Sequence, residues 1–349
     1  MSQKNSSGSS ESLATYRAFA IRAKEDGVLI ELPLREPTDN EIRIKVAYVG
    51  ICGSDLHYYF AGANGSFAIK EPLIPGHEVS GTIDLDPRGK FAQGAPVAIF
   101  PAQGGEPISG LADRPHLWRG VRYFGSAATS PHTQGAMAEY IYVQREMVRP
   151  LPPGLDVKSG ALAEPLAVAI HGVKFAGNLS GKKILISGAG PIGLLMIGAA
   201  RAAGATEITS TDLFDEALAR ARQIGANKVI NISQESVAPD FYDVIFECSG
   251  NVRAVNSAII SVQRGGIIVQ VGMISAGEQL VDIGLIVTKE IKYLGAFRFN
   301  NEMDEALTLL AQESSLHLCI TDQFPLEQIR EAFELARDSR RSGKVVIAC

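Results

Sequence analysis

The segment 186–193, with the sequence I-S-G-A-G-P-I-G, constrains the fold of this chain more than any other stretch. It follows the apolar run 183–186 and precedes the apolar and small-residue run 194–200, which predicts a strand, a glycine turn and a helix start in that order. In this context Gly188 is expected to make the tight turn, Gly190 to let the backbone approach a pyrophosphate, and Gly193 to let the helix pack on the strand. Pro191 and Ile192 are expected to lie along the cofactor at the helix N-terminus, where the free backbone N–H groups of the residues after the proline would face that pyrophosphate. A dinucleotide-binding unit is therefore predicted, although the same residues alone would also fit a simple glycine-rich turn.

An acidic residue at a suitable distance supports the prediction. The next apolar run, 207–211, ends at Asp212, which is nineteen residues after Gly193 (212 − 193). A carboxylate near this spacing binds the ribose 2′-hydroxyl and repels a 2′-phosphate. No arginine follows between Leu213 and Glu216. We therefore predict NAD rather than NADP, with Leu213 also among the cofactor-binding residues.

Composition and charge limit the remaining possibilities. The 349 residues suffice for two domains, and the net charge of −5 gives no general reason to bind nucleic acid or an anionic membrane. No apolar run is long enough to cross a bilayer. Residues 1–13 are rich in Ser and Gly, which predicts a disordered tail. The scattered cysteines form no C-x-x-C pair, which argues against a disulfide framework and favours a cytoplasmic location: Cys52, Cys248, Cys319 and Cys349.

The character of the chain changes near residue 162. From residue 15 to about 150, short β-like runs broken by Gly and Pro predict a compact β-barrel-like domain. After that, strand-like and helical runs alternate up to residue 272, which predicts a βαβ series with a parallel sheet. Two helical stretches, 303–312 and 326–338, and a last apolar run follow once this series is complete. The C-terminal segment is therefore predicted to return to the first domain, with ligands bound in the crevice between the two domains.

Residue types that carry chemistry gather in three fragments, 50–59, 75–79 and 163–166. Cysteine, histidine and carboxylate side chains are suitable zinc ligands, and a catalytic zinc site keeps one position open for water or substrate. The fragments follow no local spacing rule. From the residues alone Cys52 is more readily a small buried side chain, and His77 is either a structural histidine or a ligand.

Taken together, four motifs bring a family resemblance into view. G-I-C-G-S-D-x-H-Y, P-G-H-E, A-E-P-L-A-V-A-I-H and S-G-x-G-P-I-G, in this order over nearly the whole chain, resemble the zinc-dependent medium-chain dehydrogenases. The polyol branch, which includes the sorbitol dehydrogenases, is the nearer one. Within it the segments 122–127, 131–132, 163–171 and 295–299 most resemble the L-idonate 5-dehydrogenases and related sugar-acid dehydrogenases.

The resemblance implies a particular α/β architecture. It consists of a β-rich GroES-like catalytic domain and a Rossmann domain with a doubly wound parallel sheet. The expected ranges are 14–162 and 297–349 for a discontinuous catalytic domain and 163–296 for the Rossmann domain. A homo-oligomer, tetramer or dimer, is also implied, and the strand-like run 283–294 is a candidate interface edge.

The resemblance also assigns the metal site. Cys52 and His77 match the first two zinc ligands. Glu78 and Glu164 match acidic residues that bind the metal directly or through water, and Glu164 is also counted as catalytic. Asp55 matches a residue that orients the ligand histidine, which is a supporting role.

The remaining assignments concern the proton, the substrate and the cofactor. Ser54 and His57 match a relay that carries the proton from the substrate alcohol towards solvent, although either side chain could simply pack or cap at the end of a strand. Four residues are candidates for contact with substrate: Tyr58, Arg122, His132 and Arg298. Further residues are expected along the cofactor: Val271, Gly272, Met273, Phe297 and Arg298.

One departure from the family pattern affects the metal count. Many relatives hold a structural zinc with four closely spaced cysteines in the loop after the strand at 96–100. This chain has no cysteine between Cys52 and Cys248, so at most one zinc per chain is predicted. Asp113, His116 and His132 are conceivable substitute ligands there, but a polar surface lobe is favoured.

These assignments predict a reversible oxidation of a secondary alcohol, in a polyol or a sugar acid such as L-idonate, to a ketone. Zinc would act as Lewis acid and NAD as hydride acceptor. A sorbitol- or xylitol-type substrate is the alternative within the branch. Two other classes stay open, namely a zinc-free reductase that reduces quinones or enones with NADPH and a non-catalytic NAD-binding protein.

Overall fold

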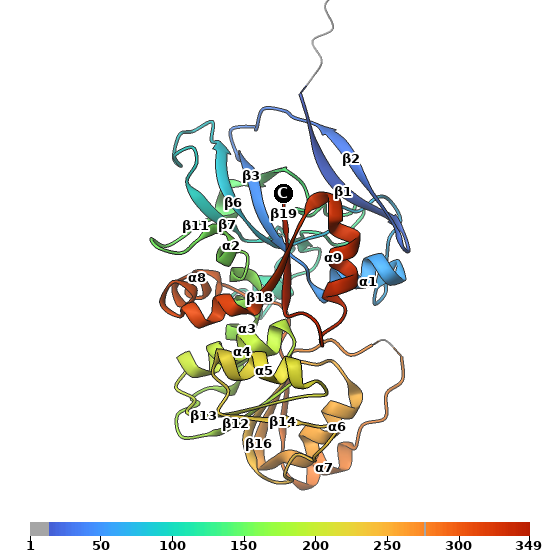
Figure 1. The fold of residues 1–349 in the computed structure, drawn as a ribbon, viewed down its shortest axis with the longest axis vertical. Coiled ribbons are helices and arrows are strands. Elements are labelled where there is room, and N and C mark those ends of the chain that lie inside the picture. Colours follow the sequence, from blue (N-terminus) through green and yellow to red (C-terminus); the bar gives the residue numbers. More distant parts are fainter. Residues whose placement is uncertain (1–13, 276) are drawn as a thin grey trace, which may run out of the picture.

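A computed structural model describes residues 14–275 and 277–349 (Figure 1). The predicted disordered tail, 1–13, lies outside the described residues. Figure 1 shows two parts stacked along the long axis, with both the first strands and the last strand of the chain in the upper, β-rich part. Helices α3 (Ala163–Ala176) and α8 (Met303–Gln312) lie at the level where the two parts meet.

The upper part is built on a seven-stranded sheet beside a separate hairpin of β1 (Thr15–Ala23) and β2 (Asp26–Pro33). Side chains alternate between buried and more exposed along its central strand, β3, as expected where one face of a strand meets the core. The order is β11 (Val148–Pro150), β7 (Pro96–Ile99), β6 (Glu78–Leu85), β3 (Glu41–Gly50), β19 (Lys344–Ala348) and β18 (Ile320–Pro325), with β10 (Tyr140–Gln144) also paired to β3.

Short elements connect these strands and shape the site. They are α1 (Gly53–Ala61), β4 (Ala63–Asn64), β5 (Phe67–Ala68), β8 (Ala102–Gln103), η1 (Pro115–Leu117), β9 (Arg122–Tyr123), η2 (Arg145–Met147), α2 (Val157–Gly160) and η4 (Leu326–Gln328).

The lower part contains a six-stranded sheet in which every pair is parallel. The order is β14 (Lys228–Asn231), β13 (Glu207–Asp212), β12 (Lys183–Ser187), β15 (Tyr242–Glu247), β16 (Val262–Gln270) and β17 (Lys292–Gly295). Helices α4 (Pro191–Ala202), α5 (Asp215–Ile224) and α6 (Val252–Ser261) connect them. The sequence order reverses between β12 and β15, and ligands bind at such a switch point in doubly wound sheets. The predicted α/β class and doubly wound parallel sheet are confirmed.

The C-terminal segment contacts both parts. Strand β19 pairs with β3 in the upper sheet, and α9 (Ile329–Ala336) packs on β18 and β19. Before them, α8 packs on α3, and η3 (Ser314–Cys319) packs on α4 and α5. The boundaries at 162/163 and 296/297 stay predictions.

The run 283–294 was expected to be strand-like, and this expectation is wrong for its first half. It forms helix α7 (Ile283–Thr288) before strand β17 begins at Lys292. A parallel neighbour cannot follow β16 through a tight turn, because a parallel pair needs a long crossover connection, which is usually helical. Separately, no helix among the described residues combines the length and the apolar character needed to cross a bilayer.

Candidate active site

The two fragments that carry Cys52 and His77 meet because β3 and β6 are neighbours. Gly50, the last residue of β3, pairs with Glu78, the first residue of β6. Helix α1 starts directly after Cys52, which is its N-cap residue. The register of β3 against β6 therefore brings Cys52, just after the end of β3, close to His77, just before the start of β6.

Asp55 fixes this junction from inside. Its fully buried carboxylate accepts the Cys52 N–H through Oδ2 and the Gly76 N–H through Oδ1, both at 2.9 Å. Gly76 has a φ of +94°, and a Cβ there would lie 2.6 Å from a Val49 methyl group, so the turn before His77 requires glycine. Asp55 was predicted to orient the ligand histidine. The structure shows it holding the backbone on both sides of the site instead of bonding to the imidazole.

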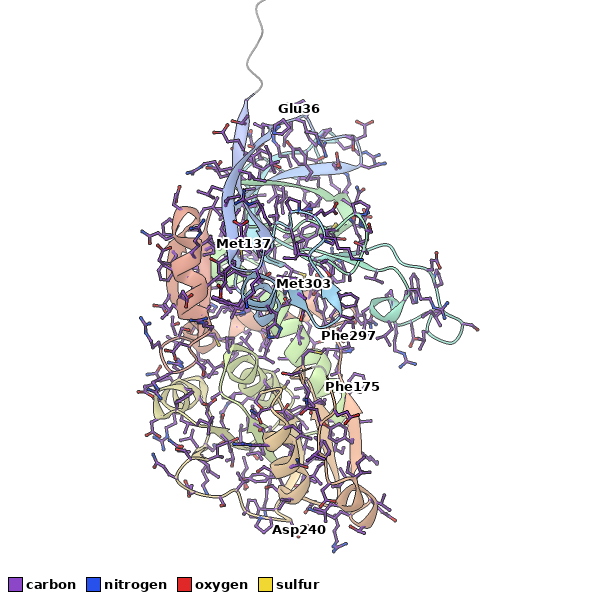
Figure 2. The ribbon with its side chains drawn as sticks, turned by 90° about the vertical axis from the view of Figure 1, so that its right-hand side faces the viewer. Glu36, Met137, Phe175, Asp240, Phe297 and Met303 are labelled. Carbon is purple, nitrogen blue, oxygen red and sulfur yellow. The ribbon has the colours of Figure 1, made fainter. Side chains whose placement is uncertain are left out.

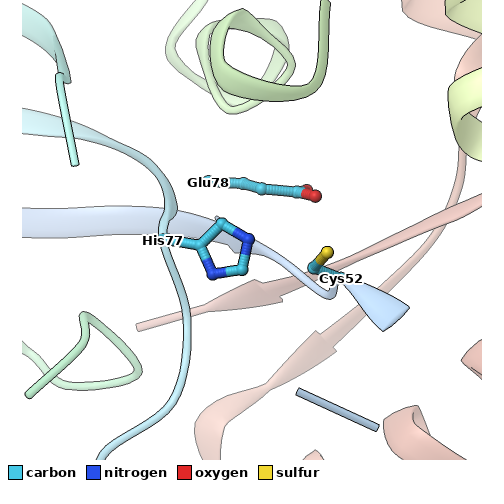
Figure 3. A group of neighbouring side chains, drawn as sticks. All are labelled: Cys52, His77 and Glu78. Atoms are coloured by element: carbon cyan, nitrogen blue, oxygen red, sulfur yellow. The ribbon is translucent and has the colours of Figure 1, made fainter. Parts of the chain in front are cut away.

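Cys52, His77 and Glu78 form one close group (Figure 3). Each offers a ligand atom, and these atoms all lie within 4.8 Å of one another. The Nδ1 of His77 and the Oε2 of Glu78 are buried without a hydrogen-bond partner among the described residues. Buried polar atoms normally have partners, and a thiolate, an imidazole and a carboxylate are ligands that zinc accepts. The residues present therefore fit a zinc ion with three protein ligands.

Glu164 lies near this group but is not part of it. Its Oε1 accepts a hydrogen bond of 2.5 Å from the hydroxyl of Tyr123. Burial raises the pKa of the Glu164 carboxyl, and Glu78 adds to the effect. The ring of Tyr123 also lies against His77, with 5.5 Å between the ring centroids. Glu164 is thus held beside the group of Cys52, His77 and Glu78 by a tyrosine that the sequence analysis did not single out.

Lys344 is a second residue that the sequence analysis missed. Its ammonium donates to Oε1 of Glu78 at 2.6 Å and to the carbonyl of Ile51 at 2.9 Å. Both side chains of the ion pair are buried, with 3% and 1% of their surface exposed. Burial alone would lower the pKa of Lys344, but Glu78 and Cys52 raise it above its usual value. The available signal was a lone lysine at the start of the apolar run 344–347.

Arg298, in the segment that follows β17 of the lower sheet, lies close to Tyr123 and Glu164. Its guanidinium lies 3.9 Å from the ring centroid of Tyr123 and 4.8 Å from that of Phe297. Figure 2 shows Phe297 at the level where the two parts meet. Burial lowers the pKa of Arg298, while Tyr123 and Glu164 oppose the shift. The hydroxyl of Tyr58, predicted to contact substrate, accepts the Ala127 N–H at 3.0 Å. Arg298 and Glu164 are therefore gathered in one site.

His132 and Arg122 are not gathered there. The Nε2 of His132 accepts the Lys70 N–H at 2.9 Å, and its Nδ1 lies 3.0 Å from the carbonyl of Thr129. Both ring nitrogens are used by the backbone, which speaks against His132 as a substrate residue. Arg122 is exposed and precedes the buried Tyr123 in β9, so the alternation of the strand directs the two side chains to opposite faces.

Ser54 and His57 lie three residues apart on α1, on the same side of the helix. Ser54 is half-buried and His57 is exposed, with its Nδ1 3.2 Å from Oδ1 of Asn64. Both side chains thus lie on the helix that begins directly after Cys52. The relay itself stays a prediction.

The polar lobe before β9 offers no comparable metal group. The ring of His116 lies against that of His171 in α3, with the centroids 4.9 Å apart, whereas Asp113 is exposed. Across residues 14–275 and 277–349, Cys52, His77 and Glu78 are the only histidine, cysteine or acidic residues that bring three potential metal-ligand atoms within 4.8 Å of one another.

The glycine turn after β12 has the geometry that the motif predicts. Gly188 has a φ of +98°, and a Cβ on Gly193 would lie 1.8 Å from the Gly188 carbonyl oxygen. A Cβ on Gly190 would meet open space, on the side where α4 begins. The turn thus needs glycine at 188 and 193 for internal reasons, and Gly190 leaves its backbone accessible.

Asp212 lies at the end of β13, against this turn. Its Oδ2 accepts the Ala189 N–H at 2.8 Å, and its Oδ1 accepts the Leu213 N–H at 2.7 Å. Val271, Gly272 and Met273 directly follow β16, which is separated from β12 by β15 in the same sheet. Three of the residues predicted along the cofactor are exposed apolar side chains: Leu213, Met273 and Phe297. Exposed apolar side chains around a polar turn are expected at a ligand site.

Comparison with known proteins agrees with this arrangement. Residues 38–153 match the alcohol dehydrogenase GroES-like domain, and residues 191–312 match the zinc-binding dehydrogenase domain. L-Idonate 5-dehydrogenase (NAD(P)(+)) of Escherichia coli is 35% identical over 314 residues, which are 88% of this chain and 91% of that protein. Sorbitol dehydrogenase of Bos taurus is 33% identical over 347 residues, which are 95% of this chain and 96% of that protein.

Solved structures show the same relationship. The crystal structure of L-idonate 5-dehydrogenase from Escherichia coli superposes with a TM-score of 0.91 at 31% identity, covering 97% of this chain and 99% of that one. The resemblance inferred from the motifs is confirmed, as is the pairing of a GroES-like domain with a Rossmann domain. The chain belongs to the zinc-binding alcohol dehydrogenase family and is an oxidoreductase of that family.

Proposed function

We propose that this protein is a cytoplasmic, NAD-dependent dehydrogenase that reversibly oxidises a secondary alcohol of a sugar acid of the L-idonate type to the ketone. One catalytic zinc per chain, and no structural zinc, completes the proposal. The observation that carries it is the close group of Cys52, His77 and Glu78 beside Glu164 and Arg298. Relatives named for L-idonate and for sorbitol support the substrate class.

The residues of the chain have separate tasks in this reaction. Cys52, His77 and Glu78 hold the metal, which when bound would lower the pKa of the substrate hydroxyl and stabilise the alkoxide. Glu164, fixed by the Tyr123 hydroxyl, faces the same space and can accept a hydrogen bond from a substrate hydroxyl or from water. Ser54 and His57 lead the proton along α1 to solvent. NAD, held on the glycine turn, would take the hydride.

Arg298 favours a sugar acid over an uncharged polyol. Among the described residues no carboxylate forms an ion pair with its guanidinium, which instead stacks on two aromatic rings. The planar fork of a guanidinium matches a carboxylate with two parallel hydrogen bonds. A substrate carboxylate would supply the missing partner. A sorbitol- or xylitol-type polyol remains the second candidate, because the Glu164 carboxylate can bind hydroxyl groups.

The cofactor preference depends on Asp212. Its carboxylate at the end of β13 would meet the ribose of a dinucleotide bound on the turn, and it would repel a 2′-phosphate. This supports NAD over NADP. NAD and a small sugar acid are the proposed partners, and neither nucleic acid nor a membrane is among them.

Assembly into a homo-oligomer, dimer or tetramer, is also proposed. Strand β17 is an edge of the parallel sheet, and unpaired edges pair readily with another chain. Exposed apolar side chains precede it: Leu280, Ile283 and Val287. Light scattering on the full-length protein tests this, with a monomer at micromolar concentration as the contradicting result.

The test of the main proposal is metal analysis of protein purified without added metal, combined with NAD-dependent turnover of L-idonate before and after chelation. About one zinc per chain, with turnover lost on chelation and restored by zinc, is the expected result. Activity that ignores the chelator would favour a zinc-free reductase. Two zinc ions per chain would show that the lobe before β9 binds metal.

A further inference from the structure

We propose that Glu247, Gln270 and Tyr293 form a positioning relay that fixes the loops at the nicotinamide end of the cofactor site and ties them to the edge strand β17. The proposal rests on the proposed binding of NAD. With the pyrophosphate on the turn after β12 and the adenosine ribose at Asp212 on β13, the nicotinamide half extends towards the loops after β15 and β16. The relay lies directly beneath those two loops.

Glu247, the last residue of β15, organises the first loop. Its carboxylate is fully buried. Oε1 accepts the N–H of Ser249 at 2.9 Å and also the Ser249 hydroxyl, while Oε2 accepts the Gly250 N–H at 3.0 Å. No cation pairs with Glu247 among the described residues, so only neutral donors surround its carboxylate. Hydrogen bonds to an ionised group are the strong ones, which makes the loop conformation depend on this carboxylate.

Gln270, the last residue of β16, joins Glu247 to the second loop. Its Nε2 donates to Oε2 of Glu247 at 2.5 Å and to the carbonyl of Gly272 at 2.6 Å. Its Oε1 accepts the hydroxyl of Tyr293 at 2.6 Å. A flipped amide would place its oxygen against two acceptors, so all three contacts fix one orientation of the side chain.

Tyr293 extends the relay to the sheet edge. It lies on β17, where its backbone pairs with Ile268, and its hydroxyl reaches along the strand to Gln270. Backbone pairing already joins β16 and β17, so the sheet does not require this side-chain bond. What the bond adds is a fixed position for the amide of Gln270.

The two loops and the glycine turn are in direct contact, so their positions are coupled. A Cβ on Gly188 would lie 3.0 Å from the Cβ of Ser249, and a Cβ on Gly272 would lie 2.3 Å from the Gly250 nitrogen. The N–H of Gly272 also donates to the Glu247 carbonyl at 2.8 Å. A shift of Ser249 or Gly272 would therefore disturb the surface on which the cofactor lies.

The test uses two variants of the full-length enzyme and one matched control. Gln270→Leu removes both side-chain links at similar volume, and Tyr293→Phe removes only the hydroxyl. The control Tyr242→Phe makes the same chemical change in a buried tyrosine at the opposite, amino end of β15. NADH binding is measured by fluorescence titration, KM for NAD and kcat by turnover, and the melting temperature without cofactor by thermal unfolding.

We expect Gln270→Leu to weaken NADH binding about tenfold and to raise KM for NAD by the same factor, because a hydrogen bond to a charged group is lost. Tyr293→Phe removes a neutral hydrogen bond and should change both quantities about threefold. In both, kcat should stay within about twofold, since neither side chain touches the reacting atoms. Tyr242→Phe should leave NADH binding unchanged even if its melting temperature falls.

Equal NADH affinity in the wild type and both variants would overturn the relay. So would a loss of NADH affinity that only follows the fall in melting temperature across all three variants. If Gln270→Leu does not fold, Tyr293→Phe decides the matter alone. A wild type that binds no NADH would instead overturn the proposed function.

Discussion

Replacement of Lys344 by methionine is expected to destabilise the metal-free protein strongly. Methionine keeps the length of the side chain but leaves the Glu78 carboxylate buried without its cation. Removal of one partner of a buried ion pair costs about 3–5 kcal/mol, because an uncompensated charge remains inside. That is a large share of the roughly 5–15 kcal/mol that keeps a domain folded.

The double variant Lys344→Met with Glu78→Gln separates this explanation from lost packing. With both charges gone, no buried ion is left, and most of the loss in unfolding free energy should be recovered. Zinc should also stabilise Lys344→Met more than it stabilises the wild type, because the metal gives Glu78 a new cation.

A matched control comes from the Rossmann part. Lys289 is also buried, but its carboxylate partner Asp240 is 58% exposed, so Lys289→Met leaves no buried charge behind. Its two hydrogen bonds to the carbonyls of Ile259 and Ile260 are lost, which should cost about 1–3 kcal/mol and be indifferent to zinc.

The assay is denaturant unfolding of metal-free protein, followed by the same measurement with zinc. The reasoning would be refuted if Lys344→Met unfolded within about 0.5 kcal/mol of the wild type, which is the range of ordinary surface substitutions. It would also be refuted if the double variant were as unstable as the single one, because the loss would then come from packing.

Three other predictions concern substrate, cofactor and acid. Arg298→Gln should raise KM for L-idonate about ten- to a hundredfold while changing KM for sorbitol little, and equal effects on both would remove the case for a carboxylate substrate. Asp212→Ser should raise kcat/KM with NADP relative to NAD about tenfold or more, as measured by initial rates with each cofactor. Burial raises the pKa of Glu302, but hydrogen bonds from His171 and from the Asn300 N–H outweigh it and lower the pKa to about 2. Because the folded value is depressed, this stabilisation is present above about pH 4.5 and is lost as the pH falls towards 2. Glu302→Gln should accordingly flatten the pH dependence of unfolding free energy in that window, and an unchanged slope would contradict the assignment.

Local motifs made the cofactor half of the site predictable. The turn from Gly188 to Gly193 and the spacing to Asp212 depend on a strand, a turn and a helix that are adjacent in sequence, so residue order fixes their geometry. Even there the sequence predicts which residues meet the cofactor, but it does not predict what holds the loops. Gln270 and Tyr293 are unremarkable polar residues until β16 and β17 are paired.

The metal half was less predictable, because its contacts join distant segments. Lys344 is 266 residues from Glu78, and no spacing rule links them. The motifs did place Cys52, His77 and Glu78 together through the family resemblance. They also suggested His132 for the substrate, but the structure uses both of its ring nitrogens to fix backbone, a difference that residue type cannot reveal.

The return of the chain to the first sheet explains why the site needs its C-terminus. Strand β19 pairs with the end of β3, and the N–H of Ile51 donates to the Val345 carbonyl at 3.0 Å, so Lys344 arrives beneath the residue that precedes Cys52. Its ammonium then takes one oxygen of Glu78 and leaves the other free towards Cys52 and His77. A carboxylate shared in this way presents a single oxygen to a metal ion. Lys344 already balances the charge of Glu78, so Arg298, which pairs with no carboxylate among the described residues, is the cation that the proposed function assigns to a negatively charged substrate.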